Sequence, residues 1–277
     1  MDYPIIPAER GDDLHNLKKS GEAALVLFMA GNQFMLMPEL IRKFRENRPR
    51  IRPIAYETLP PGLELSQILA GGAVFQGRTH VFQPDVYSSV SGEAMDRLTA
   101  EEFADPADCF VYLRNRLALM VARGNPQAVS AVTDLGRDEL VVSQPNPEYE
   151  HIAAHTIRMY EQAGGSWLVD AIMEKKRAAG TTLLTTVHHR QTPQRLVNKE
   201  ADAGPVWHTE VVAAEQAGLA VEGVPVAEAL DQRDAVKYYI TPVKTGRNPE
   251  NAREFLDFIK SPPARDVFCR YGFTTVD

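Results

Sequence analysis

The sequence lacks the features that mark several large classes of protein. It contains no run of about 18 apolar residues, so no segment is expected to span a membrane. Its two cysteines, Cys109 and Cys269, are too few for a disulfide scaffold and form no C-x-x-C pair; we expect buried free thiols, with one disulfide between them left open. The N-terminus has no basic region followed by an apolar segment, so any secretory signal has been removed or was never present.

The sequence also contains fewer basic than acidic residues. The 277 residues include 30 lysines and arginines against 37 aspartates and glutamates, a formal net charge of -7, and the basic residues are scattered. This balance argues against a nucleic-acid or anionic-membrane partner. The G-x-S-x-G, P-loop and G-x-G-x-x-G motifs are absent, so we do not expect an enzyme, although His188 or His189 beside Glu150 would suit acid–base chemistry if they converge.

The first strong pattern is an apolar strand followed directly by a helix. Residues 23–29 are continuously apolar, as in a parallel strand buried on both faces. Pro38 would cost an early-starting helix one hydrogen bond, so we expect a kink or a late start near Met37. The loop after such a strand is where open α/β sheets bind ligands, which makes Asn32 a candidate ligand contact. The alternative role of Asn32 is to cap its own helix.

The same alternation of strands and helices continues to the C-terminus. It predicts an α/β protein with mostly parallel sheets covered by helices on both faces. Residues 1–21 are polar and aperiodic, and we expect an N-terminal tail there. Residues 83–89 form a strand that ends at Ser89, whose hydroxyl could face a ligand or satisfy local backbone. Further strands are expected at 51–56, 115–122, 139–143, 181–187, 203–207 and 236–243, and helices at 63–70, 92–98, 147–163, 167–179, 210–217 and from 249 onwards.

Four segments carry a family resemblance. They read NRLALMVARGNP at 115–126, VVSQPNP at 141–147, KEADAGPVW at 199–207 and NPENAREFLDFIKSP at 248–262. In this order and spacing they resemble the type II periplasmic solute-binding proteins of ABC importers, in particular the molybdate-binding branch. The resemblance implies two lobes, each a mostly parallel sheet flanked by helices, with a ligand cleft between them. By the family's layout the parts are the tail 1–21, lobe 1 at 22–117 with 237–277, and lobe 2 at 118–236.

The resemblance also implies where the ligand is held. Members of that branch hold a tetrahedral oxyanion by hydroxyls and backbone N–H groups at loop ends and helix starts. In lobe 1 the contacts fall on Asn32, where the branch usually has serine, and on the loop 58–62, where Pro60 and Pro61 offer no N–H. With Ser89 from the strand pattern, the candidate ligand-binding residues are Asn32, Thr58, Gly62, Ser89, Tyr149, Glu150, His189 and Trp207.

Acidic residues depart from what an anion site needs. Glu57, Glu148 and Glu150 add negative charge close to the expected contacts. Because unpaired carboxylates repel an anion, they either point away from the ligand or indicate a different one. Trp207 stands where a tyrosine hydroxyl is usual, and it can donate one N–H or present an aromatic face.

Histidines leave a metal site open. His151 and His155 are one helical turn apart, a spacing that suits a metal with His189 or Glu150 as a further ligand. No complete zinc pattern occurs, and a solvated or capping side chain is the alternative for each histidine. We expect no cofactor.

These observations lead to one functional hypothesis with alternatives. The leading interpretation is a monomeric extracytoplasmic binding protein, periplasmic or membrane-anchored, that delivers an oxyanion such as molybdate or tungstate to the permease of an ABC importer. The alternatives are a binding protein for a metal complex or another small polar solute, and a cytoplasmic ligand sensor on the same fold.

Overall fold

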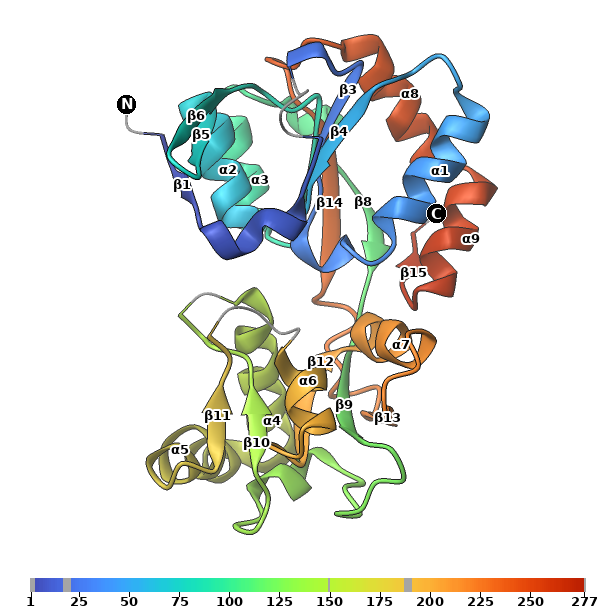
Figure 1. Cartoon of the computed structure of the whole chain (residues 1–277). Helices are drawn as coiled ribbons and strands as arrows, with labels where there is room; N and C mark the ends of the chain where they lie inside the picture. The colour runs from blue at the N-terminus through green and yellow to red at the C-terminus, as the bar shows by residue number, and fades with distance from the viewer. Residues whose placement is uncertain (1–2, 17–20, 149, 187–190, 277) are drawn as a thin grey trace. The chain divides into compact units, whose positions relative to one another are not determined.

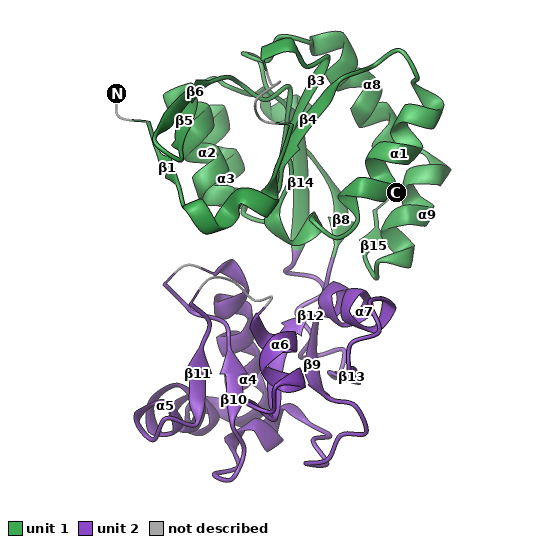
Figure 2. Ribbon diagram, viewed as in Figure 1, with its two compact units in different colours: residues 1–114, 237–277 green, residues 115–236 purple. Residues whose placement is uncertain are grey.

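The structure, a computed structural model, describes residues 3–16, 21–148, 150–186 and 191–276 (Figure 1). The chain divides into two compact units: unit 1 comprises residues 1–114 and 237–277, and unit 2 comprises residues 115–236 (Figure 2). Unit 2 is therefore one continuous segment inserted into unit 1. None of the described helices is both long and apolar enough to cross a membrane.

Unit 1 is built on a seven-stranded mixed sheet with the order β15-β8-β14-β7-β3-β4-β2. β3 pairs in parallel with β4 and with β7, and all of its residues are buried. Burial on both faces is expected of a continuously apolar strand. The strands are β2 (Leu14–His15), β3 (Leu25–Phe28), β4 (Ile54–Glu57), β7 (Val86–Ser89), β8 (Phe110–Arg114), β14 (Lys237–Pro242) and β15 (Thr274–Thr275).

Helices cover both faces of this sheet (Figure 1). α1, α8 and α9 lie on one face, where the ring centroid of Phe44 is 5.2 Å from those of Phe255 and Phe258. α2 and α3 lie on the other, where Ile68 of α2 shares a core with Phe28 of β3. The helices are α1 (Met37–Asn47), α2 (Pro61–Ala70), α3 (Gly92–Ala100), α8 (Pro249–Ile259) and α9 (Pro262–Arg270).

The N-terminal residues belong to unit 1, where the sequence predicts a tail. β1 (Ile5–Ile6) joins β5 (Gly72–Phe75) and β6 (Arg78–Val81) in a three-stranded sheet, and β2 pairs with β4. Ile6 is buried in a small cluster with Leu59 and Ala73. Strands of two residues are too short to show periodicity, so the sequence carries no signal of them.

Unit 2 has a five-stranded sheet with the order β11-β10-β12-β9-β13. β10 pairs in parallel with β11 and β12, whereas β9 is antiparallel to β12 and β13. Met120, Val206, Val211 and Val221 are part of its core. Its strands are β9 (Leu117–Ala122), β10 (Val142–Gln144), β11 (Thr182–Leu184), β12 (Ala203–Trp207) and β13 (Val221–Pro225), and its helices are α4 (His151–Asp170), α5 (Lys176–Ala178), α6 (Gln191–Val197) and α7 (His208–Gln216).

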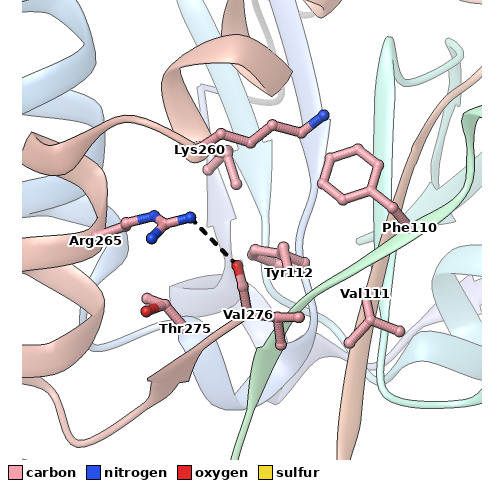
Figure 3. Close-up of a pocket in the computed structure, with 8 residues that line it drawn as sticks. Phe110, Val111, Tyr112, Lys260, Arg265, Thr275 and Val276 are labelled. Atoms are coloured by element: carbon pink, nitrogen blue, oxygen red, sulfur yellow. Dashed lines mark hydrogen bonds between the residues drawn. The ribbon is translucent and has the colours of Figure 1, made fainter.

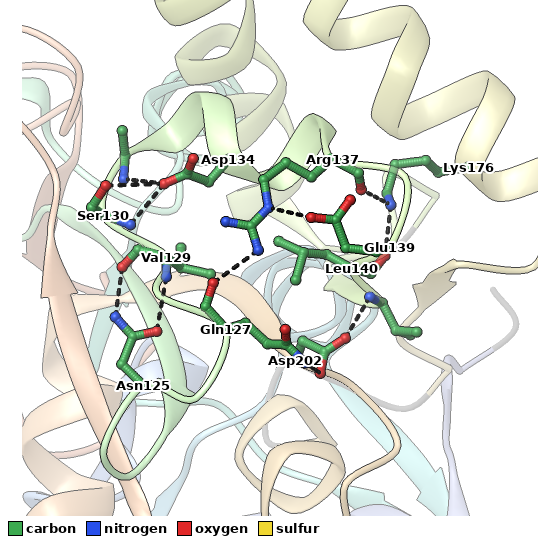
Figure 4. A network of polar contacts seen from close by, with 12 residues as sticks. Asn125, Gln127, Val129, Ser130, Asp134, Arg137, Glu139, Leu140, Lys176 and Asp202 are labelled. Carbon is green, nitrogen blue, oxygen red and sulfur yellow. Dashed lines mark hydrogen bonds and ion pairs between the residues drawn. The ribbon is translucent and has the colours of Figure 1, made fainter.

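A network of polar contacts holds the loops at the amino end of β10 (Figure 4). The Lys176 side chain is 3% exposed, and its Nζ donates to the carbonyls of Arg137 and Leu140, each at 2.6 Å. Asp202 accepts the Val141 N–H at 2.8 Å. Burial lowers the pKa of Lys176. Because this network lies at the amino end of the strand, it is separate from the carboxyl ends where ligands bind in such sheets.

The observed elements agree with the expected ones in part. The α/β class is confirmed, with mixed rather than mostly parallel sheets. α1 begins at Met37 as predicted, because Pro38 then falls in the first turn, where its missing N–H is not needed. α4 begins later than position 147 and continues through Gly165, whose φ of 66° kinks the helix. Both cysteines are free thiols, but neither is fully buried; Cys269 on α9 is exposed.

Candidate functional site

Polar side chains gather at one edge of the unit 1 sheet. β3, β4 and β7 are parallel, so their carboxyl ends meet there, and the antiparallel β14 begins beside them. We call this the unit 1 edge; it comprises Asn32, Gln33, Thr58, Ser88, Ser89, Tyr112 and Tyr238, all of which are buried. This is the edge at which open α/β sheets bind ligands.

Asn32 occupies the loop after β3 and does not cap a helix. It lies in a 3-10 turn, Gly31–Gln33, and neither this turn nor α1 has a side-chain cap. Asn32 is 5% exposed, and its Nδ2 donates to the hydroxyl of Tyr238. Its Oδ1 is buried and has no hydrogen-bond partner within the described part of the chain. A buried amide oxygen without a donor is costly, so this position suits a ligand or water that donates to it.

A second chain of hydrogen bonds runs beside Asn32. Gln33 Nε2 donates to the Tyr112 hydroxyl at 2.7 Å, and that hydroxyl lies 2.8 Å from Ser88 Oγ. Burial raises the pKa of Tyr112, which therefore stays a neutral donor. Ser89 Oγ accepts the N–H of Ser91 at 3.0 Å, which is the local role of a strand-end serine.

The loop after β4 has few N–H groups to offer. The N–H of Thr58 donates to the Asp13 carbonyl at 3.0 Å, and that of Leu59 donates to Glu64 Oε1 at 3.1 Å. Gly62 lies in the first turn of α2, where N–H groups have no intrahelical acceptor. A Cβ on Gly31 would lie 3.1 Å from the Leu59 carbonyl oxygen, so the loops after β3 and β4 are in close contact.

In unit 2 the predicted residues are divided between the described and the undescribed chain. Tyr149 and His189 lie outside the described residues. Glu150 Oε1 accepts from the Thr185 hydroxyl and from the N–H of Asn146, the latter at 3.2 Å. These partners follow β10 and β11, so Glu150 is held at the carboxyl edge of the unit 2 sheet, where its carboxylate ties two loops together.

Trp207 ends β12 and packs against His155, which in turn packs against His151. It is 3% exposed, its ring centroid lies 5.8 Å from that of His155, and His155 lies 5.2 Å from His151. Burial lowers the pKa of His155 to about 4, and the charges of His151 and Arg158 act in the same direction, so His155 is neutral at neutral pH. Within the described residues, no cluster of three or more His, Cys, Asp and Glu side chains could hold a metal ion.

A cationic side chain near the same edge of unit 2, that of Arg116, was not predicted from the sequence. Arg116 precedes β9, and its Nη2 lies 3.0 Å from Nε2 of His208, the residue after Trp207. The pKa of His208 is lowered, first by burial and then by the charge of Arg116. The antiparallel pairing of β9 and β12 brings the two residues together, and no local sequence pattern predicts this contact.

A cavity of about 300 Å³ lies elsewhere in unit 1, between β8, α9 and the C-terminal residues (Figure 3). Lys260 Nζ lies 4.0 Å from the centre of the Phe110 ring, and Arg265 Nη2 donates to the Val276 carbonyl at 3.5 Å. None of the predicted site residues lines it; Tyr112, whose hydroxyl belongs to the unit 1 edge, does. We therefore treat the strand edges, not this cavity, as the candidate site.

The chain resembles known proteins in both sequence and fold. The family of bacterial extracellular solute-binding proteins matches residues 25–274. None of the curated proteins matches the sequence.

Solved structures share the fold. The periplasmic molybdate-binding protein of Azotobacter vinelandii has a TM-score of 0.70 and 18% identity, with 91% of this chain and 100% of that one covered. The substrate-binding domain of a putative molybdenum ABC transporter from Clostridium difficile has a TM-score of 0.68 and 15% identity, covering 91% and 99%. Iron-bound HitA from Pseudomonas aeruginosa has a TM-score of 0.64 and 12% identity, covering 91% and 85%. At these identities the likeness establishes the fold alone.

Proposed function

The chain belongs to the bacterial extracellular solute-binding proteins, and on that premise we propose that it binds a small oxyanion such as molybdate or tungstate, outside the cytoplasm, and delivers it to an ABC importer. The family match confirms the resemblance seen in the sequence, and the solved structures confirm the type II periplasmic-binding-protein fold. The family is a class of binding proteins and not of enzymes. We infer that units 1 and 2 are the two lobes of such a protein.

The observation that carries the anion proposal is the chemistry of the unit 1 edge. Its groups are amides and hydroxyls, and Gly62 adds an N–H from the first turn of α2; such groups hold anions without a formal counter-charge. Asn32 is the central group, because it is buried, caps nothing and carries two N–H groups on Nδ2, of which one donates to Tyr238 and the other can donate to an anion. The proteins of similar fold that bind molybdate support the same ligand class.

We propose a contribution from both units. In unit 1 the contacts are Asn32, Gly62 and the hydroxyl of Ser89. In unit 2 Trp207 lies at the carboxyl edge of the sheet, with the Arg116 cation nearby. Thr58 and Glu150 already have protein partners, so we assign them to holding their loops, and Tyr149 and His189 remain predictions for residues that the structure does not describe.

A second candidate is a metal ion or metal complex. The buried acids Glu57 and Glu64 beside the unit 1 edge favour it, because each has an oxygen without a hydrogen-bond partner in the described chain and a cation that displaces their protons would find carboxylate ligands there. The fold is also shared with an iron-bound protein. Binding assays must therefore include metals.

A ligand screen with matched variants tests the proposal. Molybdate and tungstate should raise the thermal midpoint of the wild-type protein, since ligand at a thousandfold excess over its dissociation constant adds about 4 kcal/mol. Asn32→Ala should weaken molybdate binding by about tenfold or more, as expected for losing one hydrogen bond to a charged group. Asn47→Ala, at an exposed asparagine of α1, is the control and should bind as wild type. Stabilisation by iron or another metal alone, with no response to oxyanions, would reject the anion proposal in favour of the second candidate.

A further inference from the structure

Two glutamates and a glutamine form a buried cluster directly beneath the loop after β4. Glu57 ends β4, whereas Glu64 and Gln67 lie on α2; they are 1%, 0% and 0% exposed. Gln67 Nε2 donates to Glu57 Oε1 at 2.6 Å, and Leu59 N–H donates to Glu64 Oε1 at 3.1 Å. The cluster therefore links the strand, the helix and the loop that begins the helix.

The cluster has more acceptors than donors. Glu57 Oε2, Glu64 Oε2 and Gln67 Oε1 are all buried without a hydrogen-bond partner in the described chain. All three are acceptor atoms when the carboxyls are ionised, and protons added to the carboxyls supply donors that the ionised cluster lacks. A protonated carboxyl donates one hydrogen bond, and two buried carboxylates side by side repel each other.

Within the part of the chain that the structure describes, no ion pair neutralises Glu57 or Glu64. Asp13 lies near Thr58 and has its own ion pair with Arg10 at 3.4 Å, and the Tyr87 hydroxyl donates to the Pro61 carbonyl at 2.9 Å. Burial raises the pKa of Glu57 to about 8, opposed by the Gln67 bond and helped by the charge of Asp13. Burial and the charge of Glu57 together raise the pKa of Glu64. Tyr87 and Tyr112 also face Glu64, and burial keeps both neutral.

We propose that Glu57 and Glu64 share protons at neutral pH, that Glu64 occupies the Leu59 N–H that a bound anion would otherwise take, and that ionisation of the pair weakens anion binding. This inference rests on the proposed function. The Glu64 carboxyl accepts the hydrogen bond of the Leu59 N–H, so this N–H is not available to the solute. The solute is then bound by Asn32 and its neighbours and not by the Leu59 backbone. While the pair keeps its protons, it places little negative charge beside the anion.

Proton sharing makes anion binding depend on pH. Ionisation of the pair adds negative charge next to the unit 1 edge, which weakens anion binding. By the same coupling, a bound anion raises the pKa of the pair. For each pKa unit of that rise, the affinity for the anion falls about tenfold between the pH at which the pair is protonated and the pH at which it is ionised. This dependence of anion affinity on pH arises from Glu57 and Glu64 and does not require the titration of a histidine.

The first experiment is made without ligand. Side-chain carboxyl resonances of ¹³C-labelled glutamate should include at least one that titrates near pH 8 in the wild-type protein and disappears in Glu57→Gln or Glu64→Gln, which mimic the protonated acids. The native state binds more protons than the unfolded state between the ordinary glutamate pKa and 8. The thermal midpoint should therefore fall as pH rises through that range, and the two variants should flatten the fall. Glu215→Gln, at an exposed glutamate of α7, should keep the wild-type slope. Titration of every glutamate in the ordinary acid range, or an unchanged slope in both variants, would overturn the proposal.

The second experiment measures molybdate affinity from about pH 6 to about pH 9, a range over which we expect about a tenfold loss in the wild type. The affinity of Glu57→Gln and of Glu64→Gln for molybdate should be the same at the upper end of this pH range as at the lower end. If molybdate binds with the same affinity throughout in wild type, the effect of the pair on anion binding is wrong while the proposed function stands. If the carboxyls titrate as expected and no oxyanion binds at any pH, the proton-sharing pair stands and the proposed function fails.

Discussion

The two tryptophans of the chain differ widely in exposure. Trp207 is 3% exposed and packs on His155, whereas Trp167 is 58% exposed. Only Trp207 lies at the carboxyl end of a sheet strand, where the proposed site is. The indole fluorescence of the two residues should therefore report on different places.

A fluorescence titration separates them. Molybdate should change the tryptophan emission of the wild type and of Trp167→Phe, because a solute at the carboxyl end of β12 alters the surroundings of the Trp207 ring. Trp207→Phe should lose the change, with molybdate binding confirmed by calorimetry. The same emission change in Trp207→Phe as in wild type would place this residue away from the solute.

At single residues, the sequence predicts positions better than partners. Asn32 could be placed because a turn after an apolar strand is a local pattern. Its partner Tyr238 is 206 positions away, and the partner of Gln33, Tyr112, is 79 positions away. Such pairings come from the tertiary fold, which local spacing does not encode. The same holds for Arg116 and His208, which meet only because β9 runs antiparallel to β12.

At the scale of elements, success followed the strength of the local pattern. β12 has the predicted limits, and α1 starts where Pro38 first becomes tolerable. β8 and the β5–β6 hairpin escaped prediction; β6 is largely exposed and β8 only partly buried, so neither has a clear apolar period. The helix expected from 147 starts at His151, because Asn146 and Glu150 use their polar groups to tie the preceding loop.

Asp85 joins three elements of unit 1. It precedes β7 and is 1% exposed. Its Oδ2 accepts the N–H of Val26 in β3 at 2.8 Å, and its Oδ1 accepts the N–H of Asn248, which precedes α8, at 2.7 Å. The carboxylate thus connects two strands and a helix that are far apart in sequence.

Removing that carboxylate should destabilise unit 1. Asp85→Ala leaves buried N–H groups without acceptors, which should lower the free energy of unfolding by about 2 to 4 kcal/mol. Urea unfolding followed by circular dichroism measures the change. Asp96→Ala, at an exposed aspartate of α3, is the control and should stay within about 0.5 kcal/mol of wild type. Equal midpoints for the two variants would contradict the structural role of Asp85.

For the whole molecule, the chain path makes a physical separation feasible. Arg114 and Lys237 are directly paired in the antiparallel ladder between β8 and β14, so the ends left by removing unit 2 are neighbours. The ends of unit 2 are also close, since the Asn115 N–H donates to the Val236 carbonyl at 3.3 Å. Each unit has its own sheet and its own core.

Each unit should therefore fold alone. Residues 115–236 expressed as a fragment, and unit 1 closed by Asn-Gly between Arg114 and Lys237, should each unfold cooperatively and keep dispersed amide resonances, because a two-residue turn suits paired antiparallel strands. Neither should bind molybdate with the affinity of the intact chain, since we propose contacts in both. A fragment that binds molybdate as tightly as the whole protein would confine the site to that unit, and an unfolded fragment would mean that its core depends on the rest of the chain.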